Sequence, residues 1–296
     1  MSERCAAAAG LPDLPARPAD GHKGTFGTVL VVGGSVGMIG APALVARAAF
    51  RMGVGLVKVA TAGEVLHQVI GLEPSATGVV LPGDPSEALA AIGRADPEKS
   101  AVLAIGPGLG VTAETIALVE GCLADPSRAV VLDADGLNAL AVRLASGCLV
   151  PGTLPGRLVV TPHPGEFARL AHPLGIRLSG TDPAEREGAA RALAEALGAT
   201  VVLKGQGTVV AASCDRLYVN ESGHSAMGTG GSGDVLTGVI ASLIAQGLDP
   251  FNAARLGVYL HGRAAESWVA RYADRGMLAR ELTDALTEAV AGYVSS

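Results

Sequence analysis

A glycine-rich segment that ends in an acid is the strongest candidate for chemistry in this chain. It reads Gly-Thr-Gly-Gly-Ser-Gly-Asp from Gly228 to Asp234, and an apolar helical stretch at residues 235–244 follows directly. Glycines let successive backbone N–H groups converge on one point, and a helix N-terminus adds partial positive charge, so the segment suits a phosphate. A carboxylate there can take the proton of a hydroxyl that attacks a phosphoryl group. Asp234 is therefore the candidate base.

Two other interpretations of this segment stay open. Ser232 and Asp234 could simply cap the helix while the glycines make a tight turn. The spacing of the glycines also matches the Gly-x-Gly-x-x-Gly pattern of dinucleotide-binding proteins. That match is weak, because no strand is expected directly before it and the acid about twenty residues on, Asp249, follows a helix.

Lys204 is one of four lysines and follows an expected strand, ahead of a turn with two glycines. Its ammonium could meet nucleotide phosphates, or it could be a solvated residue at the entry of a hairpin.

His163 and Glu166 also follow a strand, three residues apart at a helix entry. They are candidates for substrate and metal contacts, or for a cap. The segment of Asp133, Ala134 and Asp135 offers two carboxylates for metal and ribose contacts or for capping a helix.

Two further glycine-rich segments follow strands, at residues 33–40 and 106–110. The first opens a helix and could approach a phosphate, although it lacks the Gly-Lys-Ser/Thr ending of a Walker-type loop. The second would bring bare backbone to the edge of the sheet, where a bulky ligand could lie. Close packing explains the first, and a simple turn the second, equally well.

The elements that must position these residues alternate between short β-branched runs and amphipathic stretches. This alternation predicts a mostly parallel sheet covered by helices on both faces. The expected strands are residues 28–32, 56–60, 101–105, 129–132, 158–161 and 200–203, and the expected helices are residues 41–52, 113–123 and 183–197, the last with Thr181 and Asp182 as caps.

Residues 208–212 and 216–219 predict an antiparallel hairpin at one edge of the sheet, and the chain after it is expected to be helical. The fold class is thus a three-layer α/β/α arrangement. Ligands bind beyond the carboxyl ends of the strands in such sheets. The candidate segments above all follow strands or begin a helix, so we expect them to meet there.

Composition narrows the functional classes. The chain has 296 residues, and 49% of them are hydrophobic, which suits one α/β domain over residues 21–296 after a flexible segment at residues 1–20. The net charge of −6 and the lack of a basic run argue against nucleic acid. No stretch has the length of a membrane span or the pattern of a signal peptide, and the four cysteines form no Cys-x-x-Cys pair. A cytoplasmic protein is expected.

Taken together, the motifs resemble the ribokinase-like superfamily, whose members place an anion hole and a catalytic Asp at the start of a late helix. Gly230, Gly231, Ser232, Gly233 and Asp234 match that element. Within the superfamily the chain is similar to the NAD(P)H-hydrate dehydratases, from about His22 to the end. The motifs that carry this likeness are His22-Lys23-Gly24, Gly40-Ala41-Pro42 and the segments at 106–110, 133–135, 161–166 and 204–205.

The resemblance implies an ADP- or ATP-dependent enzyme that uses Mg²⁺ and restores NADH or NADPH from the S epimer of its hydrate. The residues that it assigns to the hydrated dinucleotide are Ala41, Gly110, His163 and Asp234. Those that it assigns to the adenine nucleotide are Lys204, Gly205, Gln206, Gly207, Thr208 and Gly233. Glu166 falls where kinases of this superfamily place a Glu that acts on magnesium through water.

Two loops depart from the family pattern, and both bear on donor preference. Ser213-Cys214-Asp215 replaces a Pro-Asp-Gly turn, and residues 223–226 replace an Asn-Pro-Gly segment. About twenty residues precede the match, so the resemblance implies a separate epimerase as metabolic partner, and it also implies a homotetramer. The rival interpretations are a thiazole- or pyrimidine-type alcohol kinase of the same superfamily and a catalytically silent nucleotide-binding protein.

Overall fold

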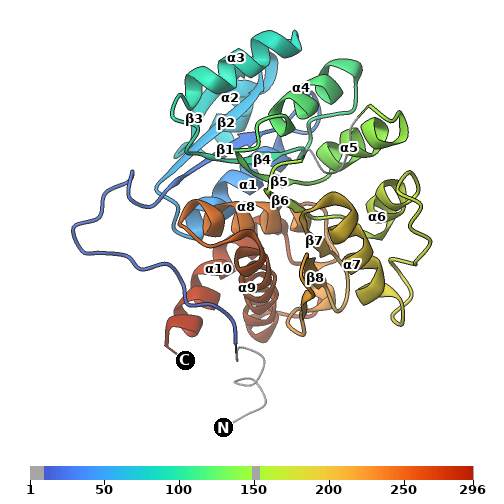
Figure 1. Cartoon of the computed structure of the whole chain (residues 1–296). Coiled ribbons are helices and arrows are strands. Elements are labelled where there is room, and N and C mark those ends of the chain that lie inside the picture. The colour runs from blue at the N-terminus through green and yellow to red at the C-terminus, as the bar shows by residue number, and fades with distance from the viewer. Residues whose placement is uncertain (1–9, 149–153, 296) are drawn as a thin grey trace.

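The computed structural model describes residues 10–148 and 154–295, and these form a three-layer α/β/α fold (Figure 1). The central sheet has nine strands in the order β3-β2-β1-β4-β5-β6-β7-β8-β9. Strands β1 to β7 are parallel, and β8 and β9 add an antiparallel edge. The predicted fold class, with its edge hairpin, is confirmed.

The strands are β1 Thr28–Val32, β2 Leu56–Ala62, β3 Thr77–Leu81, β4 Val102–Ile105, β5 Ala129–Leu132, β6 Arg157–Val160, β7 Thr200–Leu203, β8 Val209–Ala212 and β9 Arg216–Val219. The helices are α1 Gly40–Arg51, α2 Gly63–Leu72, α3 Pro85–Ala95, α4 Ala113–Leu123, α5 Asp135–Ala145, α6 Pro164–Ala171, α7 Arg186–Leu197, α8 Ser232–Ala245, α9 Pro250–Arg271 and α10 Ala279–Val294. A short 3₁₀ helix, η3, covers Ser225–Met227.

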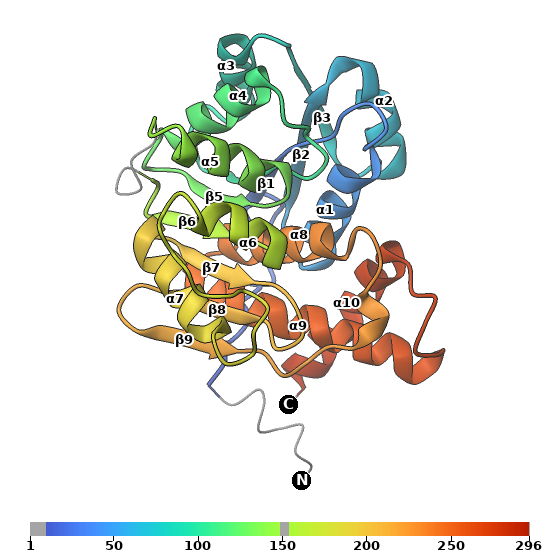
Figure 2. The ribbon, with the colours of Figure 1, turned by 90° about the vertical axis from the view of Figure 1, so that its right-hand side faces the viewer.

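The two helical layers follow from the period of two in the strands. In β1, Val29 and Val31 face one apolar core, and Leu30 and Val32 face the other. The first core is built with α1, α2, α8, α9 and α10, and the second with α3 to α7. Figure 2 shows these helices on opposite sides of the sheet. Both faces are covered, which is why the central strands read as continuous apolar runs.

The strand predictions at residues 28–32 and 200–203 match the structure, whereas β3 was missed. That strand lies at the edge of the sheet, and its apolar run covers only its last three residues, of which one is buried. Helix α7 begins at Arg186, three residues later than predicted. Asp182 instead accepts a hydrogen bond from the N–H of Ala184 within a turn ahead of the helix.

The predicted flexible segment at residues 1–20 is described from Gly10 onward, and residues 1–9 lie outside the described residues. Residues 10–20 form no helix or strand, but Tyr293 donates a hydrogen bond to the Pro12 carbonyl and the Arg17 guanidinium lies over the ring of Phe26. The flexibility of this segment stays a prediction. Among the described helices, none is long and apolar enough to cross a bilayer.

Three of the four cysteines fall within the described residues, and all three are free thiols. Cys148 and Cys214 are exposed. Cys122 lies in α4 within the second core, where burial raises the pKa of its thiol to about 12. Cys5 lies outside the described residues.

Candidate active site

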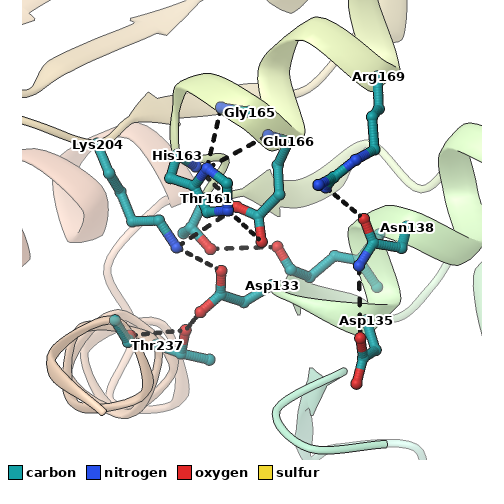
Figure 3. Close-up of polar contacts among 12 residues, drawn as sticks. Asp133, Asp135, Asn138, Thr161, His163, Gly165, Glu166, Arg169, Lys204 and Thr237 are labelled. Carbon is teal, nitrogen blue, oxygen red and sulfur yellow. Dashed lines mark hydrogen bonds and ion pairs between the residues drawn. The ribbon is translucent and has the colours of Figure 1, made fainter. Parts of the chain in front are cut away.

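The carboxyl ends of β5, β6 and β7 meet the first turn of α8, and this junction collects the polar groups of the site (Figure 3). Asp133 follows β5, Thr161 follows β6 and Lys204 follows β7. Because the strands are parallel neighbours, residues far apart in the sequence leave the sheet at the same edge. The sequence predicted this convergence, and the structure shows it.

Lys204 is held inside the site. Its Nζ donates to Oδ1 of Asp133 at 2.7 Å and lies 3.8 Å from Oε2 of Glu166. Burial alone would lower the pKa of Lys204, but the Asp133 and Glu166 carboxylates outweigh it and raise the pKa above its ordinary value. Only 19% of the Lys204 side chain is exposed, so the interpretation as a solvated lysine at a hairpin entry is wrong.

Asp133 has all its strong partners inside the protein. Besides Lys204, its second oxygen accepts a hydrogen bond of 2.8 Å from the Thr237 hydroxyl, one turn into α8. Burial would raise the pKa of Asp133, but the Lys204 ammonium and these hydrogen bonds hold it below the ordinary value. Neither Asp133 nor Asp135 caps α5, since the N-cap residue is Ala134 and no side chain caps it. Asp135 instead accepts a 2.8 Å hydrogen bond from the N–H of Gly110.

Asp234 lies in the first turn of α8, and its carboxylate makes no hydrogen bond or ion pair within the described part of the chain. Burial raises the pKa of Asp234 to about 7, the negative charge of Asp133 adds to the shift, and Lys204 opposes it. A carboxyl group with a pKa near neutrality can both accept and release a proton under physiological conditions. Its environment is therefore that of a general base.

The loop ahead of Asp234 is open in the way an anion site requires. Gly231 is the N-cap of α8 with φ of +91°, and no side chain caps the helix, so the capping interpretation of Ser232 and Asp234 is wrong. A side chain at Gly230 would meet nothing within 4 Å. The first N–H groups of a helix have no partner inside it. This turn can therefore present N–H groups to a phosphate.

His261 of α9 contacts the same turn through a hydrogen bond. Its Nε2 lies 3.0 Å from the carbonyl oxygen of Ser232, which can only accept, so Nε2 carries the proton. Burial lowers the pKa of His261 to about 4, and the imidazole is neutral at physiological pH. The Ser232 hydroxyl is also buried and has no hydrogen-bond partner among the described residues.

His163 and Glu166 form a capping box at the start of α6. The Nδ1 of His163 accepts from the N–H of Gly165 at 3.0 Å, while Glu166 accepts from the N–H of His163 at 2.7 Å. The capping interpretation of this pair is correct in geometry. It leaves the half-exposed His163 ring at the rim of the site and the buried Glu166 carboxylate facing Lys204. Burial raises the pKa of Glu166 and lowers that of His163.

The segment that follows Lys204 turns back toward β8. Gly205 and Gly207 have φ of +138° and +62°, conformations that favour glycine, and the Thr208 hydroxyl donates to the Gly205 carbonyl. The buried Arg186 of α7 donates to the carbonyls of Leu203, Lys204 and Gly207. This loop therefore has a fixed shape with Gln206 exposed at its tip.

The glycine segments after β1 and β4 pack against each other and against the next turn. Added Cβ atoms would lie 2.3 Å from the Pro107 oxygen at Gly33, 1.9 Å from the Asp133 oxygen at Gly106 and 2.7 Å from the Met38 oxygen at Gly108. At Gly33 this contact agrees with the close-packing interpretation. Gly106 and Gly108, for which a simple turn was the alternative, are also closely packed. Gly110 faces open space, and the Ala41 side chain lies beside Gly108, so two of the four predicted substrate contacts are on this half of the edge.

Sequence reasoning missed three residues that support the site: Thr237, Arg186 and His261. Thr237 follows Gly233 by four residues, which places both on one helix face, so the period of the helix could have identified it. Arg186 and His261 gave no such signal, because each lies in another helix and its contact with the site depends on how that helix packs.

The fold and this site define a ribokinase-like protein, and comparisons with known proteins are more specific. The family model described as NAD(P)H-hydrate dehydratase matches residues 29–288, and the chain belongs to this family. It is 43% identical over 258 residues to the ADP-dependent (S)-NAD(P)H-hydrate dehydratase of Neisseria meningitidis serogroup B, covering 85% of this chain and 80% of that protein.

It is also 43% identical over 280 residues to the bifunctional NAD(P)H-hydrate repair enzyme Nnr of Moorella thermoacetica. That match covers 92% of this chain and 51% of the relative, so the chain spans about half the length of the bifunctional relative. Among solved structures, the ADP/ATP-dependent NAD(P)H-hydrate dehydratase of Bacillus subtilis, co-crystallised with ATP and Mg²⁺, superposes with a TM-score of 0.75 at 30% identity. This superposition covers 97% of this chain and 100% of that one.

Proposed function

We propose that this protein restores NADH and NADPH from their S-hydrates in a reaction that consumes ADP or ATP. The observation that carries the proposal is the carboxyl group of Asp234, which stands free at an open helix N-terminus with a pKa of about 7. Membership of the NAD(P)H-hydrate dehydratase family supports the substrate class.

In the first step Asp234 takes the proton of the ring hydroxyl of the hydrate, and that oxygen attacks the terminal phosphorus of the nucleotide. The bond to the leaving phosphate oxygen breaks, so ADP would leave AMP. The N–H groups around Gly230, Gly231, Ser232 and Gly233 stabilise the negative charge on the transferring group. In the second step the ring nitrogen lone pair expels phosphate, and loss of a proton from the adjacent ring carbon restores the double bond.

The two substrates enter from different halves of the edge in this proposal. Lys204, Gly205, Gln206, Gly207, Thr208 and Gly233 would hold the adenine nucleotide. Ala41 and Gly110 would hold the hydrate from the half that follows β1 and β4, and His163, which follows β6, would reach it from the nucleotide half. The geometry supports this division, since a Cβ at Gly233 would lie 3.3 Å from the Lys204 ammonium. Gly110, by contrast, is on the Asp135 side of the turn that follows β5.

Magnesium is the metal that this chemistry calls for, and it would neutralise charge on the phosphates. Within residues 10–148 and 154–295 no three acidic, His or Cys side chains cluster as a metal site. That fits Mg²⁺, which usually binds through waters and phosphate oxygens with one or two carboxylates. Glu166 is the residue that we propose to contact it through water, because its carboxylate faces the site beside Lys204.

The rival alcohol kinase would share Asp234 and the anion loop, and the family match favours the dehydratase. We propose an NAD(P)H-hydrate epimerase as the metabolic partner, because the bifunctional NAD(P)H-hydrate repair enzyme of Moorella thermoacetica is about twice as long as the match and so has room for a second activity. The homotetramer and the cytoplasmic location stay predictions.

The test is the absorbance of reduced nicotinamide when the purified protein meets NADH-hydrate with Mg²⁺ and either ADP or ATP. We expect a rise that requires a nucleotide and that identifies the donor. No rise with either donor, while nucleotide still raises the melting temperature, would contradict the dehydratase and favour an alcohol kinase.

Replacing Asp234→Asn should lower kcat by about 10²–10⁴-fold, the usual contribution of a general base, and leave the nucleotide-induced melting shift nearly unchanged. The matched control is Asp215→Asn, which should keep full activity because Asp215 is exposed in the turn between β8 and β9. Ala212 and Ala211, which precede this turn, lie beside the start of β7 and not beside Lys204 at its end, so the expectation that this turn influences donor preference is not supported. An Asp234→Asn protein with most of its turnover would remove Asp234 from the role of base.

A further inference from the structure

The turn that follows β5 is strained at a single residue. Ala134 has φ of +49° and ψ of −118°, a conformation that costs a residue with a Cβ atom of order 1–3 kcal/mol. The surrounding backbone fixes it there: the Asp133 N–H donates to the Ile105 carbonyl, and the Gly136 N–H donates to the Asp133 carbonyl. Strain of this kind persists where the neighbouring structure requires it, and it gathers at functional sites.

The strained residue directs the acids on its two sides to different halves of the site (Figure 3). Asp133 contacts Lys204 at 2.7 Å and Thr237 at 2.8 Å, and so it joins the end of β7 to the second turn of α8. Asp135 contacts the N–H of Gly110 at 2.8 Å and Asn138 at 3.4 Å, and so it holds the loop that follows β4.

We propose that Asp133 and Asp135 are positioning residues, and that the turn they share fixes the position of the nucleotide half of the site relative to the hydrate half. The inference rests on the proposed function, which assigns Lys204 to the nucleotide and Gly110 to the hydrate. Phosphoryl transfer requires the attacking oxygen and the leaving oxygen to be nearly in line. A rigid link between the two binding halves provides that alignment before either substrate arrives.

The same turn also sets the charge around the base. The charged groups that act on Asp234 are Asp133 from the end of β5, Lys204 from the end of β7 and Asp135 from α5. Asp133 and Asp135 favour the protonated form of Asp234, and Lys204 favours the ionised form. A substitution at Asp133 should therefore alter the proton affinity of Asp234 as well as the position of Lys204.

The hydrate half is tested with two variants of one residue. Asp135→Ala removes the acceptor for the Gly110 N–H, and we expect it to raise KM for the hydrate about tenfold while KM for the nucleotide stays within about twofold. Asp135→Asn keeps an acceptor oxygen at the same place and should recover most of the lost affinity. Equal effects of Asp135→Ala on both KM values, or no effect on either, would overturn the proposal for this half.

The nucleotide half is tested with Asp133→Asn, which keeps the shape and removes the charge. We expect weaker nucleotide binding by calorimetry, and an acid limb of the kcat profile that moves about one pH unit lower, because the like charge next to Asp234 is gone. Thr237→Val is the comparison variant, because it removes the hydrogen bond to Asp133 but keeps the charge. It should weaken nucleotide binding less and leave the acid limb in place.

A carboxyl ¹³C titration of the substrate-free protein gives a readout that does not depend on turnover. The Asp234 resonance, assigned by its loss in Asp234→Asn, should titrate near pH 7 in the wild type and lower in Asp133→Asn. An unchanged midpoint in folded Asp133→Asn would overturn the inference. If Asp133→Asn fails to fold, Lys204→Gln replaces it, with a shift to higher pH expected and no shift counting against the inference. Failure of the proposed function alone would appear as normal titrations and nucleotide binding without dehydration of the hydrate.

Discussion

The edge of the sheet that carries the site has two halves, and they are built on different principles. After β1 and β4 the backbone packs directly on backbone, and glycines at 33, 106 and 108 leave no space for a side chain. After β5, β6 and β7 the half is filled by charged side chains that pair with one another, chiefly Asp133, Glu166 and Lys204. Substitutions in the first half should therefore lower the stability of the protein, and substitutions in the second half should lower its activity.

The largest effect is expected from Gly106→Ala in the packed half. Its φ is +118°, and the new Cβ would lie 1.9 Å from the backbone oxygen of Asp133, which cannot move away without breaking the turn. We expect a loss of about 4 kcal/mol or more in the free energy of unfolding, measured by urea denaturation.

Gly147→Ala is the matched control, because Gly147 also has a positive φ, of +67°, but would meet nothing within 4 Å. It should cost about 1 kcal/mol. Similar losses for the two variants would show that the backbone conformation, and not the close contact, limits the packed half.

A smaller effect of opposite sign is expected in the charged half from Asp234→Asn. The folded pKa of about 7 lies above the ordinary 3.8, so the folded state binds a proton more tightly than the unfolded chain. The stability that this group contributes is present below pH 3.8 and is lost as the pH rises through 7. Removing the charge should stabilise the protein by about 2–4 kcal/mol at pH 8.

Denaturation at several pH values checks this prediction and carries its own control. The difference between Asp234→Asn and the wild type should shrink toward zero near pH 4, where the folded wild type is protonated. An Asp234→Asn protein that is no more stable than the wild type at pH 8 would mean that the carboxyl group is well solvated and not held as a base.

The smallest effect on stability is expected from Gly230→Ala, which sharpens the comparison of the two halves. Its Cβ would meet no atom within 4 Å, and the residue has no positive φ, so unfolding should change by less than about 1 kcal/mol. The methyl group would occupy the space proposed for the transferring phosphate, and we expect kcat/KM to fall at least tenfold. Full activity in a stable Gly230→Ala protein would place the anion elsewhere.

The sequence predicts the buried strands and the convergence of the polar residues that follow them, because these depend on burial and on the parallel direction of the strands. Strands such as Thr28–Val32 are buried on both faces and therefore read as apolar runs, and the acids and Lys204 follow such runs, so their convergence could be expected. Strand Thr77–Leu81 lies at the exposed edge, and its apolar run is limited to its last three residues. The contacts of Arg186 and His261 depend on tertiary placement, and the strained φ of Ala134 has no local signal, since alanine usually favours helix.

The buried thiol of Cys122 gives the chain its own reporter of local opening. A thiol with a pKa of about 12 inside the second core is almost entirely unionised at neutral pH and reacts with alkylating reagents only after α4 separates from the sheet. The exposed Cys148 and Cys214 would react first. The later rate of Cys122 modification then measures how often this helical layer opens, with and without nucleotide, in the native protein and without an introduced cysteine.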